Sequence, residues 1–152
     1  MVTLANSSLT QKIVWMAITA IIISSIAIPV YAAKPQRPSS GGSTLELVEL
    51  RLVVNGQSIV LSPSQTVTLK TGTGFYVETD VKNTSAKTIN VNVQFYFNSS
   101  TQTLNSDIGP GDIHTFKSKN FKVAPGYNTL SVLVYNTSNN DAKSQSNVIV
   151  GN

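Results

Sequence analysis

The chain has 152 residues, with 41% apolar residues, 12% charged residues and a formal net charge of +4. That length allows one domain of ordinary size. The chain contains no cysteine and one histidine, which excludes disulfides, thiolate nucleophiles, Cys-ligated metals and any site that needs two imidazoles. The charged fraction is about half of the usual quarter, unlike that of a charged disordered tail or a coiled coil.

Residues 1–32 have the pattern of a targeting segment. Residues 13–30 form an apolar run that follows the single charge of Lys12. Val30-Tyr31-Ala32 then places small or apolar residues where a signal peptidase needs them. A charged start, an apolar middle and a small-residue end are typical of a secretory signal peptide. We therefore expect cleavage after Ala32 and a mature protein that is secreted or lies at the cell surface.

An uncleaved membrane anchor is the alternative interpretation of the same segment. The run at residues 13–30 is just long enough to span a bilayer, and the folded part would then lie outside the membrane. Lys34 and Arg37 follow the run and outnumber Lys12 before it, which disfavours an anchor whose N terminus lies inside. Residues 33–43, AKPQRPSSGGS, form a linker, and residues 44–152 form the predicted domain.

After the linker, the hydrophobic pattern predicts strands and turns. Residues 45–54 alternate on either side of a phase slip at Leu47-Val48, which predicts a β-bulge. Asn55-Gly56 predicts a two-residue hairpin turn, because both positions favour a positive φ. Residues 89–97 have the clearest period of two. The other expected strands cover residues 58–61, 65–70, 75–82, 113–123, 128–135 and 143–150.

These eight strands predict an all-β fold. Short strands separated by turns at this spacing are typical of an immunoglobulin-like antiparallel β-sandwich of 7–8 strands, here preceded by an N-terminal apolar helix as signal peptide or anchor. One face of the strand at residues 89–97 should form the core, with Tyr96 on the opposite face. The expected core residues are Ile89, Val91, Val93, Phe95 and Phe97, packed against Phe75, Val77 and Val81.

Two segments resemble CARDB-type modules, a cell-adhesion-related immunoglobulin-like group. FYVETDVKNTSAKTINVNVQFYFN, residues 75–98, resembles the central hairpin of those modules. IGPGDIHTFKSKNFKVAPGYNTLSVLV, residues 108–134, resembles their next stretch, with two Pro-Gly turns and a Val-rich strand. Ser146-Asn147 lies where the family tends to carry Glu-Ser-Asn, but Lys143-Ser144-Gln145 replaces its usual acidic residue, which argues against a carried-over calcium site. The resemblance implies extracellular adhesion or spacing and no catalysis.

The sequence offers few residues for catalysis or metal binding. His114 lies near Asp112, but no G-x-S-x-G motif supplies a nucleophile, so we expect an exposed histidine at a strand end. Glu78 and Asp80 share one strand face and are candidate ligands for a hard cation. No Asp-rich calcium loop accompanies them, so we expect a solvated pair instead. The prediction is a protein that is not an enzyme and has no catalytic residue, cofactor or metal.

The basic residues, the single tryptophan and the apolar run limit the partners that we expect. Lys117, Lys119 and Lys122 form the only local basic group of the expected mature chain, which is too sparse for nucleic-acid binding. We interpret them as lysines that protect a strand edge. The only tryptophan, Trp15, lies in the targeting run, so the mature domain lacks the Trp platform of many sugar-binding modules. The membrane is expected as a partner only through residues 13–30, if they are uncleaved.

Three N-x-S/T sequons, at Asn83, Asn98 and Asn136, are candidate N-glycosylation sites. All three fall at predicted strand ends or turns, where asparagine is also favoured for its own turn chemistry.

We expect a non-enzymatic extracellular structural or adhesive protein that acts through contacts with other protein chains, including copies of itself. One alternative is a filament subunit that donates residues 45–54 to a neighbour's sheet by donor-strand complementation. Pairing of that strand within its own chain competes with this reading, because the Asn55-Gly56 turn favours local pairing. Another alternative is a membrane-anchored accessory subunit of an extracytoplasmic complex.

Overall fold

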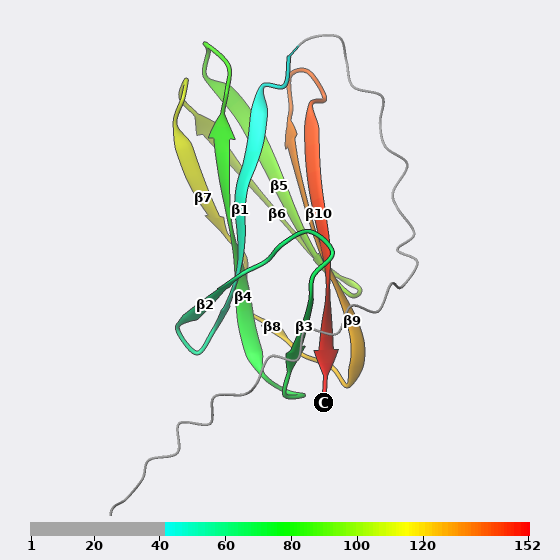
Figure 1. Ribbon diagram of the computed structural model, residues 1–152. Helices are drawn as coiled ribbons and strands as arrows, with labels where there is room; N and C mark the ends of the chain where they lie inside the picture. Colours follow the sequence, from blue (N-terminus) through cyan, green and yellow to red (C-terminus); the bar gives the residue numbers. More distant parts are fainter. Residues whose placement is uncertain (1–41) are drawn as a thin grey trace, which may run out of the picture.

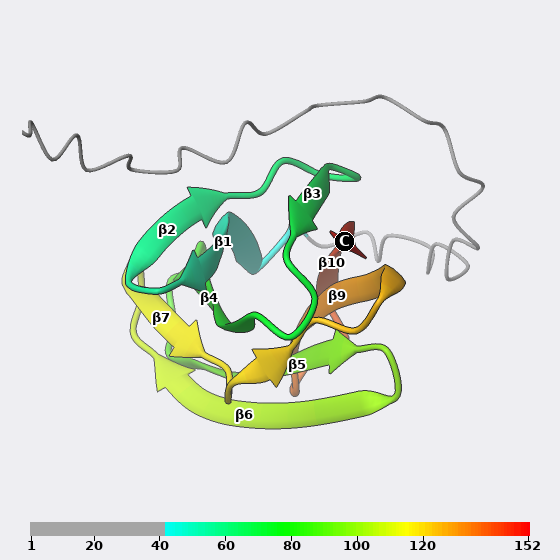
Figure 2. The same ribbon diagram turned by 90° about the horizontal axis from the view of Figure 1, so that it is seen from below.

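The computed structural model describes residues 42–152, which form strands and the turns between them. Ten strands make two sheets that lie face to face, as Figures 1 and 2 show. β1 begins at one end of this sandwich and the C terminus lies at the other (Figure 1). The predicted all-β fold is confirmed. The predicted N-terminal helix, the cleavage site after Ala32 and the linker up to residue 41 lie outside the described residues.

Sheet 1 carries the first part of the domain. Its strand order is β2-β1-β4-β7, and β8 pairs with the start of β4. All of its strand pairs are antiparallel. The strands are β1 (Leu45–Val54), β2 (Gln57–Val60), β4 (Gly74–Asn83), β7 (Ile113–Lys117) and β8 (Phe121–Lys122).

Sheet 2 has the strand order β3-β10-β9-β5-β6. Its pairs are antiparallel except for β3, which runs parallel to β10. The expectation of a purely antiparallel sandwich is wrong at this one pair. The chain crosses from sheet 1 to sheet 2 between β2 and β3, and this crossing places β3 alongside the last residues of β10. The strands are β3 (Thr66–Leu69), β5 (Ile89–Phe97), β6 (Ser100–Ile108), β9 (Gly126–Asn136) and β10 (Ala142–Gly151).

The β1–β2 hairpin confirms two local predictions. The register of β1 against β4 shifts between Leu47 and Glu49, so Val48 is the extra residue of a β-bulge. Asn55 and Gly56 have φ values of 49° and 79°, the left-handed conformation that a two-residue turn of this kind requires. The bulge allows Leu45 and Leu50 to point into the core from the same strand, although they are an odd number of residues apart.

The core lies between the two sheets and contains every residue that the sequence pattern assigned to it. Phe75 of β4 meets Phe97 of β5 edge to face, with ring centroids 5.0 Å apart, and Phe121 of β8 packs against both rings. Tyr96 lies on the opposite, outer face, as the period of two predicted. Aromatic and β-branched side chains on alternate residues therefore hold the two sheets together.

Two strand predictions differ from the structure and raise the total from eight to ten. β6 was not predicted, because its sequence, STQTLNSDI, is polar throughout except for Leu104 and Ile108. The strand expected over residues 113–123 is interrupted at Ser118 and becomes β7 and β8. Ser118 donates its N–H to Val77 O and accepts the Val77 N–H on its Oγ, both at 2.8 Å, so the backbone leaves the ladder there.

A search of the described strands and turns finds no helix with the length and apolarity needed to cross a membrane.

Candidate functional site

The outer edges of β1 and β10 are only half covered by neighbouring strands. β2 pairs with β1 over Arg51–Val54 alone, and β3 pairs with β10 over Val148–Gly151 alone. The remaining halves of both strands face each other along one side of the sandwich, where Figure 1 shows β1 beside β10. We call the space between residues 45–49 and residues 142–145 the slot.

The slot is a groove of about 580 Å³. Its walls combine apolar side chains with one acidic and one basic side chain, so an occupant meets both contact area and charge. Its volume is in the range of ligand-binding clefts, although it is open along one side of the sandwich. The lining residues are Ser43, Leu45, Glu46, Leu47, Pro63, Thr84, Lys143, Ser144 and Gln145.

The connection between β2 and β3 closes one end of the slot. Leu61 donates its N–H to Leu50 O at 2.8 Å, and Ser64 donates its N–H to Ser146 O at 3.0 Å. Gln145 fastens the same connection from β10, because its buried Nε2 donates to Leu61 O at 2.8 Å. The backbone of β1 before Leu50, and that of β10 before Gln145, has no strand on this side within the described chain.

Asp141 holds the other end of the slot together. Its carboxylate accepts the Thr44 N–H at 2.5 Å, the Thr44 Oγ1 hydroxyl at 3.1 Å and the Ser43 hydroxyl at 3.1 Å. Burial opposes ionisation of this carboxyl, but the hydrogen bonds from Thr44 and Ser43 outweigh burial and lower its pKa. The start of β1 is therefore tied to the β9–β10 turn by an ionised side chain.

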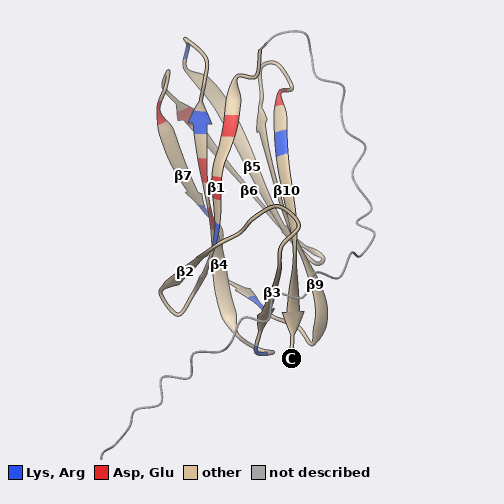
Figure 3. Ribbon diagram, in the orientation of Figure 1, with Lys and Arg blue, Asp and Glu red and all other residues tan. Residues whose placement is uncertain are grey.

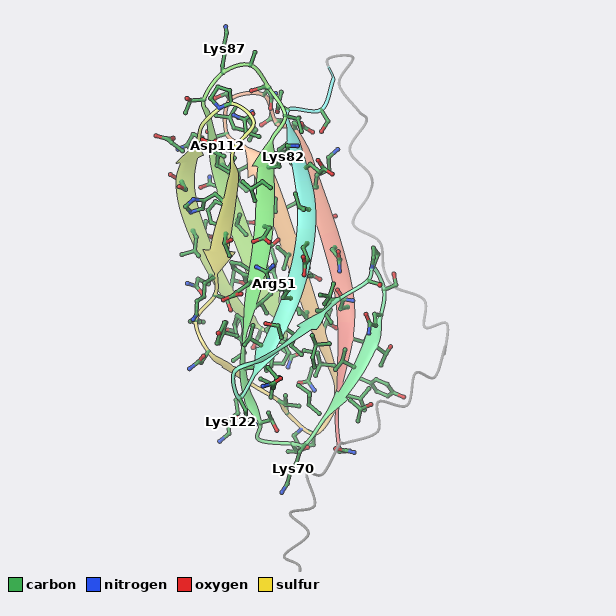
Figure 4. The ribbon with its side chains drawn as sticks, turned by 60° about the vertical axis from the view of Figure 1, so that its left-hand side comes forward. Arg51, Lys70, Lys82, Lys87, Asp112 and Lys122 are labelled. Atoms are coloured by element: carbon green, nitrogen blue, oxygen red, sulfur yellow. The ribbon has the colours of Figure 1, made fainter. Side chains whose placement is uncertain are left out.

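Arg51 occupies the place where the sequence offered a cation site. The guanidinium donates to both oxygens of Asp80, at 2.7 and 3.0 Å, and its Nε lies 3.5 Å from Glu78. Figure 4 shows Arg51 on the outer face of sheet 1. Burial raises the pKa of Asp80, but the hydrogen bonds from Arg51 and Thr115 dominate and lower it. In the described residues, no group of three potential ligands is placed to hold a metal.

Sequence reasoning missed Arg51, because it lies 29 residues from Asp80 in the chain. Only the register of β1 against β4 brings Arg51 to Asp80, and no sequence motif marks the pair. β1 and β4 pair antiparallel although β2 and β3 lie between them in the chain, and their register shifts between Leu47 and Glu49.

His114 is not part of a catalytic arrangement in the described chain. It lies exposed on β7, with its ring centroid 4.7 Å from that of Phe116. No hydrogen bond joins it to Asp112 within residues 42–152, and Asp112 belongs to the turn before β7, where Figure 4 labels it. The structure therefore places His114 on a strand of sheet 1 without an orienting carboxylate.

The three lysines of the local basic group lie at different places. Lys117 lies over the Tyr76 ring, with Nζ 3.8 Å from its centroid, and Lys119 lies 5.9 Å from the centroid of Phe121. Lys122 belongs to β8 at the end of the sandwich (Figure 4). Two of the three ammonium groups rest on aromatic rings, as cation–π pairs do.

The sequon asparagines differ in how much of their side chain is accessible. Asn83 is 0% exposed, and its Nδ2 donates to Lys87 O and Ile108 O. Asn136 is 2% exposed and donates to Thr44 Oγ1. Asn98 lies exposed in the turn between β5 and β6, with a φ of 51°. The Asn98 Nδ2 also donates, to Asn128 Oδ1 at 2.8 Å, so all three amide nitrogens are hydrogen-bonded and Asn98 differs from the other two in being exposed.

No family model matches this sequence, and no curated protein matches it. Among solved structures, the chain is similar to a β-glucuronidase of Bacteroides uniformis, with a TM-score of 0.45 and 9% identity over 66% of this chain and 12% of that one. A second structure, of Bacteroides uniformis β-glucuronidase 2 covalently bound to cyclophellitol-6-carboxylate aziridine, gives the same values. The chain thus spans a small part of the length of these enzymes.

Proposed function

We propose that this protein is a non-enzymatic structural or adhesive module outside the cell, and that it acts through contacts with other protein chains, including copies of itself. The slot is the observation that carries the proposal. It presents unpaired backbone groups from two sheets at one place, and an exposed strand edge pairs readily with an extended segment of another chain. The module is either released after cleavage at Ala32 or held at the membrane by residues 13–30.

We further propose that the sandwich is immunoglobulin-like. The order β10-β9-β5-β6 in sheet 2 supports this, because immunoglobulin folds place their last two strands beside the third and, in the variable type, add a further strand next to the third. β1, β4 and β7 then correspond to the opposite sheet. Such folds carry loops at both ends and free strands at the sides, and they serve many unrelated binding roles.

The walls of the slot suit a partner strand of mixed character. Leu47 and Pro63 offer apolar contact, while Glu46 and Lys143 place one charge of each sign beside the free edges. A strand with alternate apolar side chains can pack against the first two and pair its backbone with β10 or β1. The backbone bonds supply affinity, and the side chains in the groove select the register.

A filament assembled by donated strands is the second candidate, and the half-open edge of β1 favours it. In the single chain, residues 45–54 lie between β2 and β4. The first half of that strand is held on one side by β4 and at its start by Asp141. If this half exchanges between copies, the position beside β4 in each copy receives the strand of another.

A proline in the free edge tests the contact between copies. Ser146 O points toward the slot, where it accepts from Ser64, and backbone groups alternate along a strand, so the Ser144 N–H points the same way and has no backbone partner in the described chain. Ser144→Pro removes this N–H, which is tolerated at an edge, and blocks pairing there. Ser144→Ala, the matched control, keeps it.

We expect the intact chain and Ser144→Ala to self-associate at micromolar concentration, and Ser144→Pro to sediment as a monomer with an unchanged free energy of unfolding. Sedimentation velocity measures the first quantity and urea denaturation the second. Equal association of all three proteins would show that the slot is not the contact, and a monomeric intact chain would contradict association between copies.

A further inference from the structure

The outer face of sheet 2 is almost free of charge. Asp107, at one corner, is its only charged side chain in the described strands. Sheet 1, in contrast, carries several charged residues along β1 and β4, as Figure 3 shows. Amides, hydroxyls, tyrosines and a few aliphatic side chains cover the rest. Its outward residues include Asn90, Asn92, Gln94, Tyr96, Asn105, Tyr127, Ser131 and Tyr135. We call this surface the tyrosine face.

Three tyrosines form a line along this face. Tyr127 and Tyr135 belong to β9, and Tyr96 of β5 lies opposite Ser131, which is midway between them in the sequence of β9. A strand advances by about 3.4 Å per residue. The three rings therefore mark a track of about 27 Å, with one ring at intervals of about 14 Å.

Two of these rings are tied down along the sheet. The Tyr96 hydroxyl donates to Gln94 Oε1 on the same strand, and the Tyr135 hydroxyl accepts from Asn92 Nδ2 across the strand pair at 3.1 Å. Both side chains are half-buried, as expected for a ring that leans on its neighbours and keeps its other side open. Tyr127 is 70% exposed. The rings of Tyr96 and Tyr135 thus offer flat apolar surfaces whose orientation is already set.

An amide ladder runs beside the rings. Asn90 Nδ2 donates to Asn105 Oδ1 at 3.0 Å and to Asp107 Oδ1 at 2.7 Å. Asn105 Nδ2 in turn donates to Asn90 Oδ1 at 2.7 Å and to Asn92 Oδ1 at 2.8 Å. These bonds use both N–H groups of Asn90 and of Asn105 and hold the side chains in place. One N–H of Asn92 and one lone pair each on the Asn92 and Asn105 oxygens remain for a ligand.

The geometry points to an extended neutral polysaccharide as the ligand of the tyrosine face. A pyranose ring has an apolar C–H face that packs on an aromatic ring, and hydroxyls at its edge that both donate and accept hydrogen bonds. The tyrosines and the amide ladder offer both kinds of partner side by side. This inference goes beyond the proposed function and uses a different surface from the slot.

The absence of positive charge on the tyrosine face argues against charged polymers and lipid surfaces as its ligands. Nucleic acids and anionic polysaccharides need lysine or arginine to neutralise their charge. Among the described strands of sheet 2 the only such residue is Lys143, which lines the slot and not the tyrosine face. A lipid surface needs an apolar or basic face. A neutral, hydroxyl-rich polymer needs neither basic residues nor an apolar surface, so a polar face without charge suits it.

Affinity electrophoresis of the full chain, including its N-terminal segment, tests the inference. The gels contain cellulose derivatives, soluble chitin, mannan, a β-1,3-glucan or dextran, and hyaluronan serves as the anionic comparison. We expect retardation by at least one neutral polymer, unchanged by salt. Tyr96→Ala and Tyr135→Ala should each weaken it about tenfold, and Tyr96→Phe should keep most of it because the ring remains.

Tyr76→Ala is the matched control, because Tyr76 lies on sheet 1 under Lys117. It should bind the polymer as the intact chain does, and urea denaturation of each variant shows that it is folded. Retardation by no neutral polymer overturns the inference. Retardation by hyaluronan alone, or equal losses from Tyr76→Ala and Tyr96→Ala, overturns it as well. If Tyr96→Ala and Tyr135→Ala change only the sedimentation of the protein alone, the face is a contact between copies and no glycan site.

Discussion

Single polar side chains fix the positions where the strands begin and end. Asn83 illustrates this, because its buried amide joins Lys87 O and Ile108 O across two turns and leaves no polar atom unpaired. In the described chain, every buried side-chain nitrogen or oxygen has a hydrogen-bond partner. A sequence rich in asparagine therefore satisfies the turns of a sandwich with amides rather than with charges.

The stability of the fold at acidic pH depends in part on Asp141, which holds one end of the slot. Its folded pKa lies below the ordinary value, so it stabilises the fold fully above the unfolded pKa, and this contribution is lost as the pH falls through the folded pKa. We expect the free energy of unfolding to fall below about pH 4. In Asp141→Asn, which is neutral at every pH, the fall should be smaller.

Urea denaturation at neutral and acidic pH measures this difference. Asp80 supplies the rest of the fall in both proteins, because its pKa is also lowered by Arg51 and Thr115 against the effect of burial. An equal fall in the intact chain and in Asp141→Asn would mean that the hydrogen bonds to Thr44 do not stabilise the start of β1.

At the scale of the strand, the alternation of β5 predicts opposite outcomes for neighbouring residues. Phe95 is 0% exposed in the core, so Phe95→Ala should lower the free energy of unfolding by about 3–5 kcal/mol. Tyr96 points to the tyrosine face, and Tyr96→Ala should cost far less. Chemical denaturation of both variants checks the register, and equal losses would contradict the pairing of β5 with β9.

How well each strand could be predicted follows from where its neighbours lie. β5 has a strand on either side and one buried face, so burial imposes a strict period of two. β6 lies at the edge of the sheet, and its inward residues Gln102 and Ser106 remain partly wet. Its sequence therefore keeps no apolar period, and nothing local marks it as a strand.

The slot and the tyrosine face could not be predicted from the sequence for a related reason. Each depends on which strands become neighbours. The parallel pairing of β3 with β10 leaves residues 142–145 uncovered, and Tyr96 meets Ser131 only through the register of β5 on β9. The core residues, in contrast, are marked by their own hydrophobicity and needed no knowledge of the topology.

At the scale of the whole molecule, the two surfaces divide the sandwich. The slot opens along one side, between the free edges of two sheets, and the tyrosine face covers the outside of sheet 2. Figures 1 and 2 show how the two sheets lie against each other. Sheet 1 carries the ion pairs of Arg51 on its own outer face. Contacts between protein chains at the slot are the central claim of the proposed function.

Site-specific photo-cross-linking in the cells that produce the protein tests this claim most directly. A photoreactive residue replaces Ser144 in the slot, and in a control it replaces Ile113, which is 57% exposed on β7 at the opposite edge of sheet 1. The account predicts that illumination joins position 144 to a discrete protein chain and leaves position 113 without such a product. Equal products from both positions, or none from position 144, would contradict it.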